Sequence, residues 1–206
     1  MGSCNHLTHR ANPVFHGSKH MIIRLHECPP QPWKNGLGST REIAVQPSDE
    51  GSGGFLWRAS IAEVDSAAPF SVFPGIDRTI VLLAGNGFTL TLDGTGEHPL
   101  TTPFVPFAFP GETQVTVTLA GGATRDFNLM VQRRRARGEV LVWRQPGAEQ
   151  LARDTVLVFC ARGMIETADG TLAAGDAWRP AATAEGSIVL ADQALALVAR
   201  VEAHAT

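Results

Sequence analysis

The most polar segment of the sequence runs from Pro32 to Ala44. It combines two cations, Lys34 and Arg41, with an amide, hydroxyl groups, a carboxylate and two glycines. Lys and Arg pair with carboxylates, Arg through two parallel hydrogen bonds, and glycine lets the backbone approach a ligand closely. This composition favours a site for a small acid. Short Gly-rich loops are also common on ordinary surfaces, so a loop of solvated charges is the alternative.

Polar side chains also interrupt two apolar, strand-like runs farther along the chain. Asp77 and Arg78 stand at the entrance of one run, and Asp126 and Asn128 alternate with apolar residues in another. Residues two apart on a strand share a face, so Asp126 and Asn128 should point the same way. An inward Asp needs a partner, which Arg58 or Arg78 could supply in a ligand site or in a purely structural ion pair.

We expect these groups to meet in one polar cavity, because charges next to apolar strands cannot be buried separately without large desolvation costs. The excess of cations over acids invites an anion. The aromatic residues Phe70, Phe73, Phe107, Phe109 and Trp57 are instead expected in the core. The predicted ligand-binding residues are Trp33, Lys34, Asn35, Gly36, Thr40, Arg41, Glu42, Arg58, Arg78, Asp126 and Asn128.

The elements that must position these residues have the pattern of strands. From Met21 onward, runs rich in Val, Ile, Thr, Phe and Trp recur between Gly and Pro at intervals typical of an all-β sandwich or barrel. In 88–92 and 115–119 every second residue is apolar, so one face packs inward. The 206 residues, of which 44% are apolar and 18% charged, suffice for one large domain or two small ones.

An internal repeat divides the strands into two sets. Segment 79–87 aligns with segment 155–163, and an Asp-Gly pair follows each at the same offset. This order of strand, tight turn, strand and hairpin is typical of a cupin jelly roll. The sequence therefore predicts an all-β bicupin of two jelly-roll-like β-barrel halves (RmlC-like cupin). The repeat also favours a strand over a helix for 191–201.

Three segments are predicted. Residues 1–20, rich in Gly, Ser, Asn and His, are interpreted as a disordered extension or mis-assigned start. Residues 21–137 form the first cupin barrel with the polar pocket, and residues 138–206 form a second, degenerate barrel. The basic run Arg133–Arg135, with Arg137, is expected to be a solvated strand end and turn.

We expect neither a metal nor another cofactor. A metal-binding cupin needs His-x-His, a Glu and a later His that converge on one ion. The turn at 74–78 has no His, the later strand offers Gln114, and His26 and His98 stand alone.

Charge and cysteine content bound the partners and the compartment. The formal charge of −3 and the pI near 6.1 argue against nucleic acid, and no apolar run is long enough for a membrane helix. The cysteines Cys4, Cys28 and Cys160 are odd in number and lack CxxC spacing, which favours a reducing, cytoplasmic location. The expected partner is a small-molecule carboxylate, with a homodimer as a possibility.

The chain resembles the HutD/Ves family. The resemblance rests on Trp33-Lys34-Asn35-Gly36-x-Gly38-x-Thr40-Arg41-Glu42-Ile43, Trp57-Arg58-x-Ser60-x-Ala62, Pro69-Phe70-Ser71-x-Phe73-Pro74-Gly75-x-Asp77-Arg78 and Asp126-Phe127-Asn128-x-Met130. It runs from about Arg24 to Arg134, and Leu37 departs from it where members usually have Gly. The resemblance implies a bicupin fold and an association with histidine degradation, without a defined catalytic activity.

Three functions agree with the sequence. The first is a non-catalytic protein that binds a small carboxylate such as urocanate or formylglutamate and so moderates histidine utilisation. The second is a metal-independent isomerase, lyase or hydrolase for such an acid, with Glu42 or Asp126 as general base and Lys34 or Arg41 holding the substrate. The third is a structural or protein-interaction module in which the polar residues only seal the barrel.

Overall fold

The computed structural model describes residues 21–48, 54–93, 96–181 and 186–204, and the predicted extension 1–20 lies outside this part. The described chain is built from strands and one 3-10 turn, η1 (Leu25–Glu27). No helix in it is long and apolar enough to cross a membrane. The strands are β1 (Met21–Ile23), β2 (Gln31–Pro32), β3 (Gly38–Pro47), β4 (Phe55–Val64), β5 (Ile76–Ala84), β6 (Phe88–Leu92), β7 (Gly96–Leu100), β8 (Phe107–Pro110), β9 (Val115–Leu119), β10 (Thr124–Gln132), β11 (Ala136–Trp143), β12 (Gly147–Gln150), β13 (Thr155–Arg162), β14 (Met164–Thr167), β15 (Gly170–Ala173), β16 (Ala177–Arg179), β17 (Ser187–Leu190) and β18 (Leu195–Ala203).

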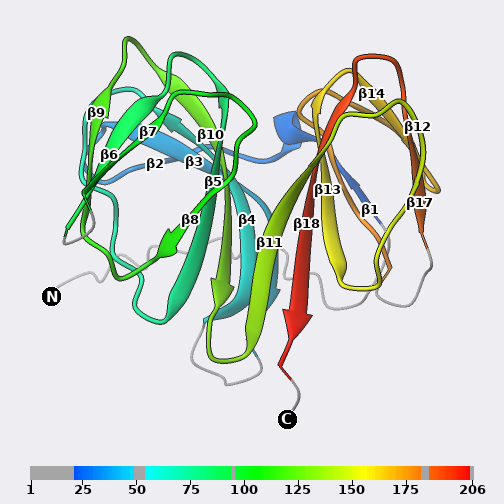
Figure 1. Cartoon of the computed structure of the whole chain (residues 1–206), viewed down its shortest axis with the longest axis horizontal. Coiled ribbons are helices and arrows are strands. Elements are labelled where there is room, and N and C mark those ends of the chain that lie inside the picture. The colour runs from blue at the N-terminus through cyan, green and yellow to red at the C-terminus, as the bar shows by residue number, and fades with distance from the viewer. Residues whose placement is uncertain (1–20, 49–53, 94–95, 182–185, 205–206) are drawn as a thin grey trace, which may run out of the picture.

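The first half of the molecule is a barrel-like sandwich (Figure 1). A six-stranded sheet in the order β2-β3-β4-β10-β5-β8 packs against a three-stranded sheet, β7-β6-β9. The alternation in β6 and β9 places Phe88, Leu90 and Val117 between the sheets, where they are buried against Ile80 and Leu82 of β5. Apolar burial between the two layers thus holds this half together.

The second half has the same plan. A five-stranded sheet, β1-β16-β13-β18-β11, packs against the four-stranded sheet β12-β17-β14-β15 over a separate buried cluster. The order β8-β5-β10-β4 of the first half corresponds to β16-β13-β18-β11 of the second, and β18 is a strand, as the repeat predicted. The predicted all-β architecture of two cupin-type halves is therefore confirmed.

The sheets cross the predicted division of the chain at both ends. The first strand, β1, pairs with β16 and so belongs to the second half, where its blue ribbon lies among the yellow and red strands in Figure 1. The second half begins with β11 at Ala136, slightly before the predicted boundary at 138. Local composition did not reveal that β1 belongs to the second half, because β1 and its partner β16 lie far apart in the sequence.

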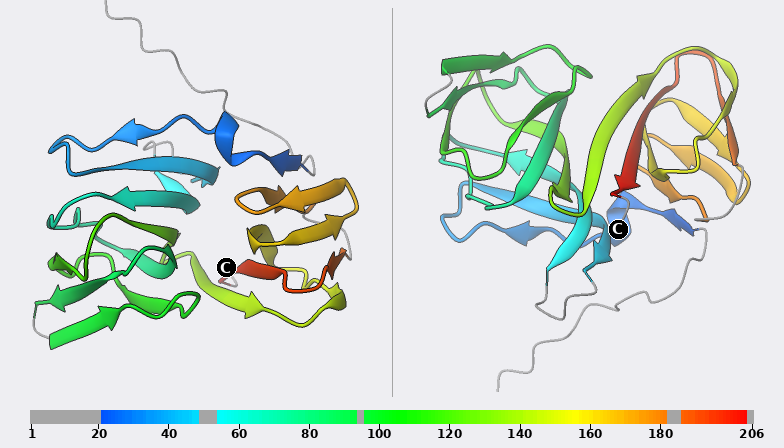
Figure 2. Two further views of the ribbon diagram at one scale, coloured as in Figure 1. Left: turned by 90° about the horizontal axis from the view of Figure 1, so that it is seen from above. Right: turned by 60° about the horizontal axis from the view of Figure 1, so that its bottom comes forward.

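The two halves share a core between their large sheets, which lie side by side in both views of Figure 2. Phe127 of β10 and Phe159 of β13 have ring centroids 5.6 Å apart, and both side chains are buried. Neighbours such as Val81 and Leu82 point to opposite faces of β5, so one strand contributes both to this shared core and to the interior of its own barrel.

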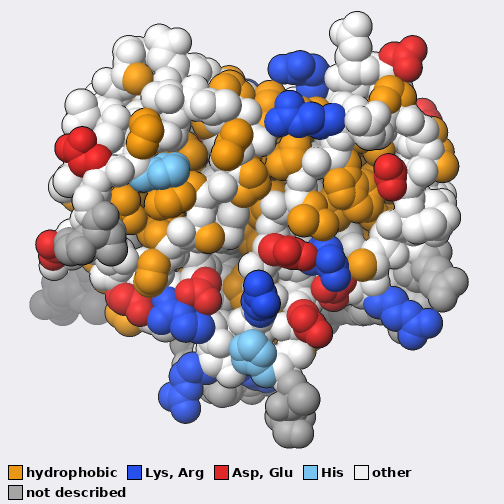
Figure 3. Space-filling model, in the orientation of Figure 1, with side chains coloured by type: hydrophobic (Ala, Val, Ile, Leu, Met, Phe, Trp, Pro, Cys, Tyr) orange, Lys and Arg blue, Asp and Glu red, His pale blue; other side chains and the backbone are white. Residues whose placement is uncertain are grey.

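The basic run Arg133–Arg135 forms the turn between β10 and β11, as predicted. Arg133 donates to Asp77 and to Glu112, each at 2.6 Å. Figure 3 shows acidic and basic side chains interleaved along the lower part of this face, below an apolar area. Acidic residues of neighbouring elements therefore offset part of the charge of this basic turn.

Candidate ligand-binding site

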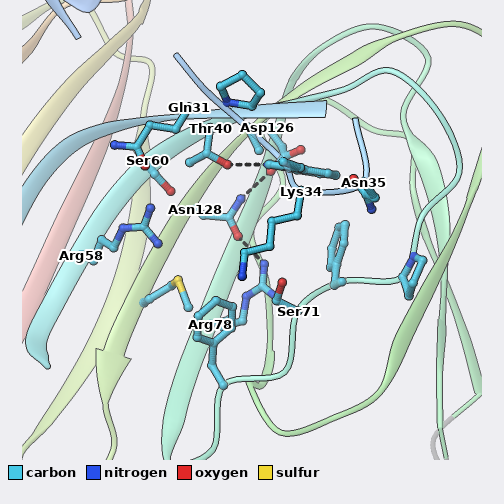
Figure 4. A pocket seen from close by; sticks show the side chains of 17 residues that line it. Gln31, Lys34, Asn35, Thr40, Arg58, Ser60, Ser71, Arg78, Asp126 and Asn128 are labelled. Atoms are coloured by element: carbon cyan, nitrogen blue, oxygen red, sulfur yellow. Dashed lines mark hydrogen bonds between the residues drawn. The ribbon is translucent and has the colours of Figure 1, made fainter. Parts of the chain in front are cut away.

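A cavity of about 480 Å³ opens in the first half, between the large sheet and the segments that precede β3 and β5 (Figure 4). Its walls combine charged, amide and hydroxyl groups with apolar and aromatic surface. The lining residues are Gln31, Pro32, Trp33, Lys34, Asn35, Thr40, Arg58, Ser60, Ala62, Pro69, Phe70, Ser71, Phe73, Arg78, Asp126, Asn128 and Met130.

Strand register brings the polar wall together. Strands β3, β4, β10 and β5 are neighbours in the sheet, and residues directly opposite each other on one face lie about 5 Å apart. The rows are Thr40, Ala62 and Asp126; Ser60 and Asn128; and Arg58, Met130 and Arg78. Residues distant in the chain thus become one surface because each strand presents every second side chain to the cavity.

The turn between β2 and β3 carries Lys34 over this surface. Gly36 adopts a left-handed conformation (φ +70°), and the Asn35 side-chain oxygen accepts a hydrogen bond from the Leu37 amide at 3.1 Å. Both features fit a tight turn. In Figure 4 the Lys34 side chain extends from this turn toward Asn128 and Arg78.

Trp33 fixes the base of the same turn. Its indole Nε1 donates to Thr40 Oγ1 at 2.8 Å, which anchors the ring to β3. A Cβ at Gly38 would lie 2.4 Å from the Glu63 carbonyl oxygen and 3.0 Å from the Trp33 ring. Glycine is therefore required at position 38 for β3, β4 and Trp33 to pack this closely.

A buried polar chain, Arg78–Asn128–Asp126, crosses the cavity wall. Arg78 donates to the Asn128 side-chain oxygen at 2.9 Å, and the Asn128 amide donates to Asp126 Oδ2. Burial raises the pKa of Asp126 to about 7, although the Arg78 charge and the Asn128 hydrogen bond oppose the shift. Near neutral pH the Asp126 carboxyl can therefore exchange a proton.

Aromatic rings enclose the Arg78 guanidinium. Its central carbon lies 5.1 Å from the Phe70 ring centroid, 5.7 Å from that of Phe73 and 5.0 Å from that of Phe109. Burial lowers the pKa of Arg78 to about 10, with Asp126 opposing and Arg58 adding to the shift. The side chain still carries its charge at neutral pH, and the ring faces favour that charge.

Arg58 has an acidic partner beside the cavity. Its Nε donates to Glu42 Oε2 at 2.8 Å, so Glu42 offsets the Arg58 charge. Glu42 itself is not part of the cavity wall. The arrangement gives Glu42 the role of orienting Arg58 and does not support Glu42 as a general base.

The structure brings eight of the predicted site residues to the cavity and leaves three outside it. Gly36 shapes the turn, and Glu42 binds Arg58. Arg41 lies on the opposite face of β3 from Thr40, where it donates to the Cys28 carbonyl at 2.6 Å and lines a separate hollow with Glu63 and Arg125. The prediction that Arg41 joins this cavity was wrong because adjacent strand residues point to opposite faces.

Several lining residues were not predicted. Ser60 and Met130 follow from the alternation that already selects Arg58 and Asn128, so register could have found them. Phe70 and Phe73, expected in the core, line the cavity and contact Arg78 from the segment between β4 and β5. An aromatic residue carries the same sequence signal in both places, so the pattern could not distinguish them.

The second half has an apolar interior at the corresponding place. In the first half, Asp126 of β10 pairs with Leu82 of β5. Leu82 aligns with Val158 in the repeat, and Val158 pairs with Val198 of β18. Val198 therefore occupies the position that corresponds to Asp126. Val198 and Trp178 are buried in the apolar cluster. Nowhere in the described residues do three His, Cys, Asp or Glu side chains come together in a way that could hold a metal ion.

Comparisons with known proteins identify relatives. Residues 25–198 match the HutD family model. An uncharacterised 21.2 kDa protein in the hutC 3′ region of Pseudomonas putida is 45% identical over 72% of this chain and 77% of its own length. Protein Ves of Cronobacter sakazakii is 44% identical over 53% of this chain and 59% of its own. The structure of HutD from Pseudomonas fluorescens SBW25 superposes with a TM-score of 0.80 at 30% identity, covering 91% of this chain and all of that one.

Proposed function

Because the chain belongs to the HutD family, we propose that it binds a small carboxylic acid of histidine breakdown and so moderates histidine utilisation. Urocanate and formylglutamate are the candidate ligands. In this proposal the protein acts in the cytoplasm, and binding does not require a reaction.

The charge of the cavity is the observation that carries the proposal. Lys34 and Arg78 face it, whereas Asp126 is the acid among its lining residues and Glu42 already offsets Arg58. With Asp126 ionised and Arg58 paired with Glu42, the groups in and beside the cavity leave one positive charge without an acidic partner. A carboxylate would neutralise this charge, and the apolar walls would strengthen the attraction by excluding water.

A metal-independent enzyme is the second candidate, and Asp126 favours it. A carboxyl group whose pKa is about 7 is suited to accept and return a proton at neutral pH. It lies in the same cavity as the cations that would hold an acid substrate. Incubation of the protein with urocanate or formylglutamate, followed by NMR, would reveal turnover, and unchanged spectra after long incubation would favour binding alone.

Calorimetric titration of urocanate and formylglutamate into the wild type and variants tests the binding proposal. Lys34→Ala should weaken binding about 10- to 100-fold, because a hydrogen bond to a charged group contributes roughly 1.5 to 3 kcal/mol. Arg41→Ala is the matched control, since Arg41 points away from the cavity, and should leave the affinity within about twofold.

Two results would contradict the proposal. The first is that neither acid binds the wild type, and the second is that Lys34→Ala and Arg41→Ala weaken binding equally. Either result would favour the structural role, in which the polar residues close the barrel.

A further inference from the structure

Two arginines, Arg144 and Arg162, form a pair at the surface where the halves of the molecule meet. The guanidinium carbon of Arg144 lies 5.9 Å from the Phe104 ring centroid, and that of Arg162 lies 5.3 Å from it. Both arginines are exposed, whereas Phe104 is buried. Phe104 lies between β7 and β8 of the first half, while the arginines follow β11 and end β13 of the second half. Only the packing of the two halves therefore assembles this arginine pair.

The arginine pair has no acidic partner in the part of the chain that the structure describes. Other arginines, such as Arg58, Arg133 and Arg200, each bind a carboxylate. Arg144 instead donates from Nη2 to the Phe104 carbonyl oxygen, at 3.2 Å. Two positive charges held against one ring repel each other, so an anionic group at this place would relieve the repulsion. Figure 3 shows adjoining basic side chains at the top of this seam, above apolar surface.

An unusual backbone conformation holds the ring between the arginines. Phe104 is left-handed (φ +61°), which a bulky residue rarely adopts. Its amide donates to the Leu82 carbonyl oxygen at 2.9 Å, and its own carbonyl oxygen accepts from Arg144, so both of its backbone polar groups are fixed. Strained residues persist only where the surrounding structure determines them, and they gather at functional sites.

A register shift in β13 aims Arg162 at the same ring. Val158 and Cys160 face the interior of the second half, and simple alternation would point Arg162 the same way. The pairing of β13 with β18 shifts between Cys160 and Arg162, and the Arg162 side chain reaches the Phe104 ring of the shared core instead. Irregularities of this kind redirect side chains. The backbone thus departs from regular geometry on both sides of the contact that forms the pair.

The surroundings of the pair favour a protein ligand over a small molecule. Small-molecule sites are concave, whereas these arginines stand exposed at the surface. Val105, directly after Phe104, is 49% exposed, and Met164, two residues after Arg162, is 55% exposed. Arginine and methionine are enriched in protein interfaces. A complementary partner offers carboxylates to the arginines and an apolar side chain beside them.

We propose that the arginine pair is a docking surface for an extended, acidic segment of a partner protein. The two guanidinium carbons cannot be farther apart than the sum of their distances to the Phe104 centroid. In an extended segment, residues two apart share a face and lie roughly 6 to 7 Å from each other, which falls within this span. Two acids at this spacing would bind one arginine each. None of the three residues of this surface lines the cavity of the first half, so the inference goes beyond the proposed function.

A peptide with this spacing tests the proposal. The acetylated and amidated peptide Leu-Thr-Glu-Thr-Glu-Thr-Leu is titrated into the isotope-labelled protein at physiological salt and followed by NMR. The dissociation constant should be below about 1 mM, with shifts of the Phe104 amide and of the Nε–H groups of the pair. The neutral peptide Leu-Thr-Gln-Thr-Gln-Thr-Leu should bind at least about tenfold more weakly, because it offers the arginines no charge.

Two double variants with the same net charge assign the binding to the pair. Arg144→Ala with Arg162→Ala should weaken binding of the acidic peptide at least about tenfold. Arg134→Ala with Arg137→Ala removes the same charge from two exposed arginines elsewhere and should keep the affinity within about threefold. All four arginines are exposed, so both variants are expected to fold.

Four results would overturn the proposal. The acidic peptide might fail to bind the wild type, or the two double variants might weaken it equally, which would show attraction to charge in general. Diphosphate that binds as tightly as the peptide, with the same shifts, would make the pair a site for a small anion. A wild-type dimer in analytical ultracentrifugation that dissociates in the Arg144→Ala and Arg162→Ala variant would make the partner a second copy of this chain.

Discussion

Asp126 shows how burial changes the behaviour of one side chain. It lies on a strand between two apolar layers, 1% exposed, and the nearby Arg78 charge only partly offsets the loss of water. Its proton affinity is consequently higher in the folded protein than in the unfolded chain. Stability must then depend on pH.

Asp126 should make the wild type less stable as the pH rises from about 4 to about 7. The folded protein holds this proton more tightly, so the added stability is complete below the ordinary pKa of 3.8 and is lost as the pH rises through about 7. The limit is on the order of 4 kcal/mol, at about 1.4 kcal/mol per pH unit.

Asp126→Asn mimics the protonated carboxyl and should lack this decline. Urea denaturation at several pH values measures the difference between the two proteins, and Asp65→Asn, at an exposed position, is the control. Parallel wild-type and Asp126→Asn profiles would contradict the assignment.

The sequence predicts which residues supply the chemistry better than it predicts where they point. Alternation correctly paired Asp126 with Asn128, because both lie within one uninterrupted strand. Arg41 and Arg58 look alike in sequence, yet only Arg58 reaches the cavity. Which face of β3 turns inward is decided by pairing with β4, and this long-range register leaves no local signal.

At the scale of elements, the β2–β3 turn depends on close packing beneath it. Gly38→Ala should lower the free energy of unfolding by several kcal/mol or displace the turn, because its Cβ would lie 2.4 Å from a backbone oxygen. Gly36→Ala should cost only about 1 to 2 kcal/mol, since the space around Gly36 is open and only the left-handed backbone is strained.

Thermal unfolding of both glycine variants, with the Trp33 fluorescence as a probe of the turn, measures these effects. Equal losses of stability in the two variants would show that backbone strain, rather than the contact at Gly38, limits this turn.

The turn between β10 and β11 should not give the protein affinity for nucleic acid. Arg133 is paired with Asp77 and Glu112, and the whole chain has a formal charge of −3. Fluorescence anisotropy with labelled duplex DNA at physiological salt should show no submicromolar binding. Tight binding that is lost in Arg133→Ala would contradict this expectation and favour direct control of transcription.

At the scale of the molecule, the two halves are joined by a buried apolar layer as well as by the chain. The layer includes Phe127 and Phe159, one from each large sheet. Internal repetition in the sequence predicted two similar halves, but it could not predict this layer. Residues on both faces of a buried strand are apolar, and the pattern does not say which neighbour each face meets.

Phe127→Ala should destabilise both halves together, by about 3 to 5 kcal/mol, the usual cost of removing a fully buried aromatic ring. Urea denaturation followed at Trp57 in the first half and at Trp178 in the second, with the other tryptophans replaced by Phe, measures each half. The two transitions should coincide in the wild type and shift together in the variant. Separate midpoints in the wild type would show that the halves unfold independently.

The pairing of β1 with β16 has a consequence for how the protein is made. Met21–Ile23 leaves the ribosome early, but its partner Ala177–Arg179 is synthesised about 150 residues later. The edge of the second large sheet can therefore be completed only when translation is nearly finished. Contacts this distant slow folding. This early segment is therefore among the last to find its place, and a newly made chain that stalls before β16 keeps β1 unpaired.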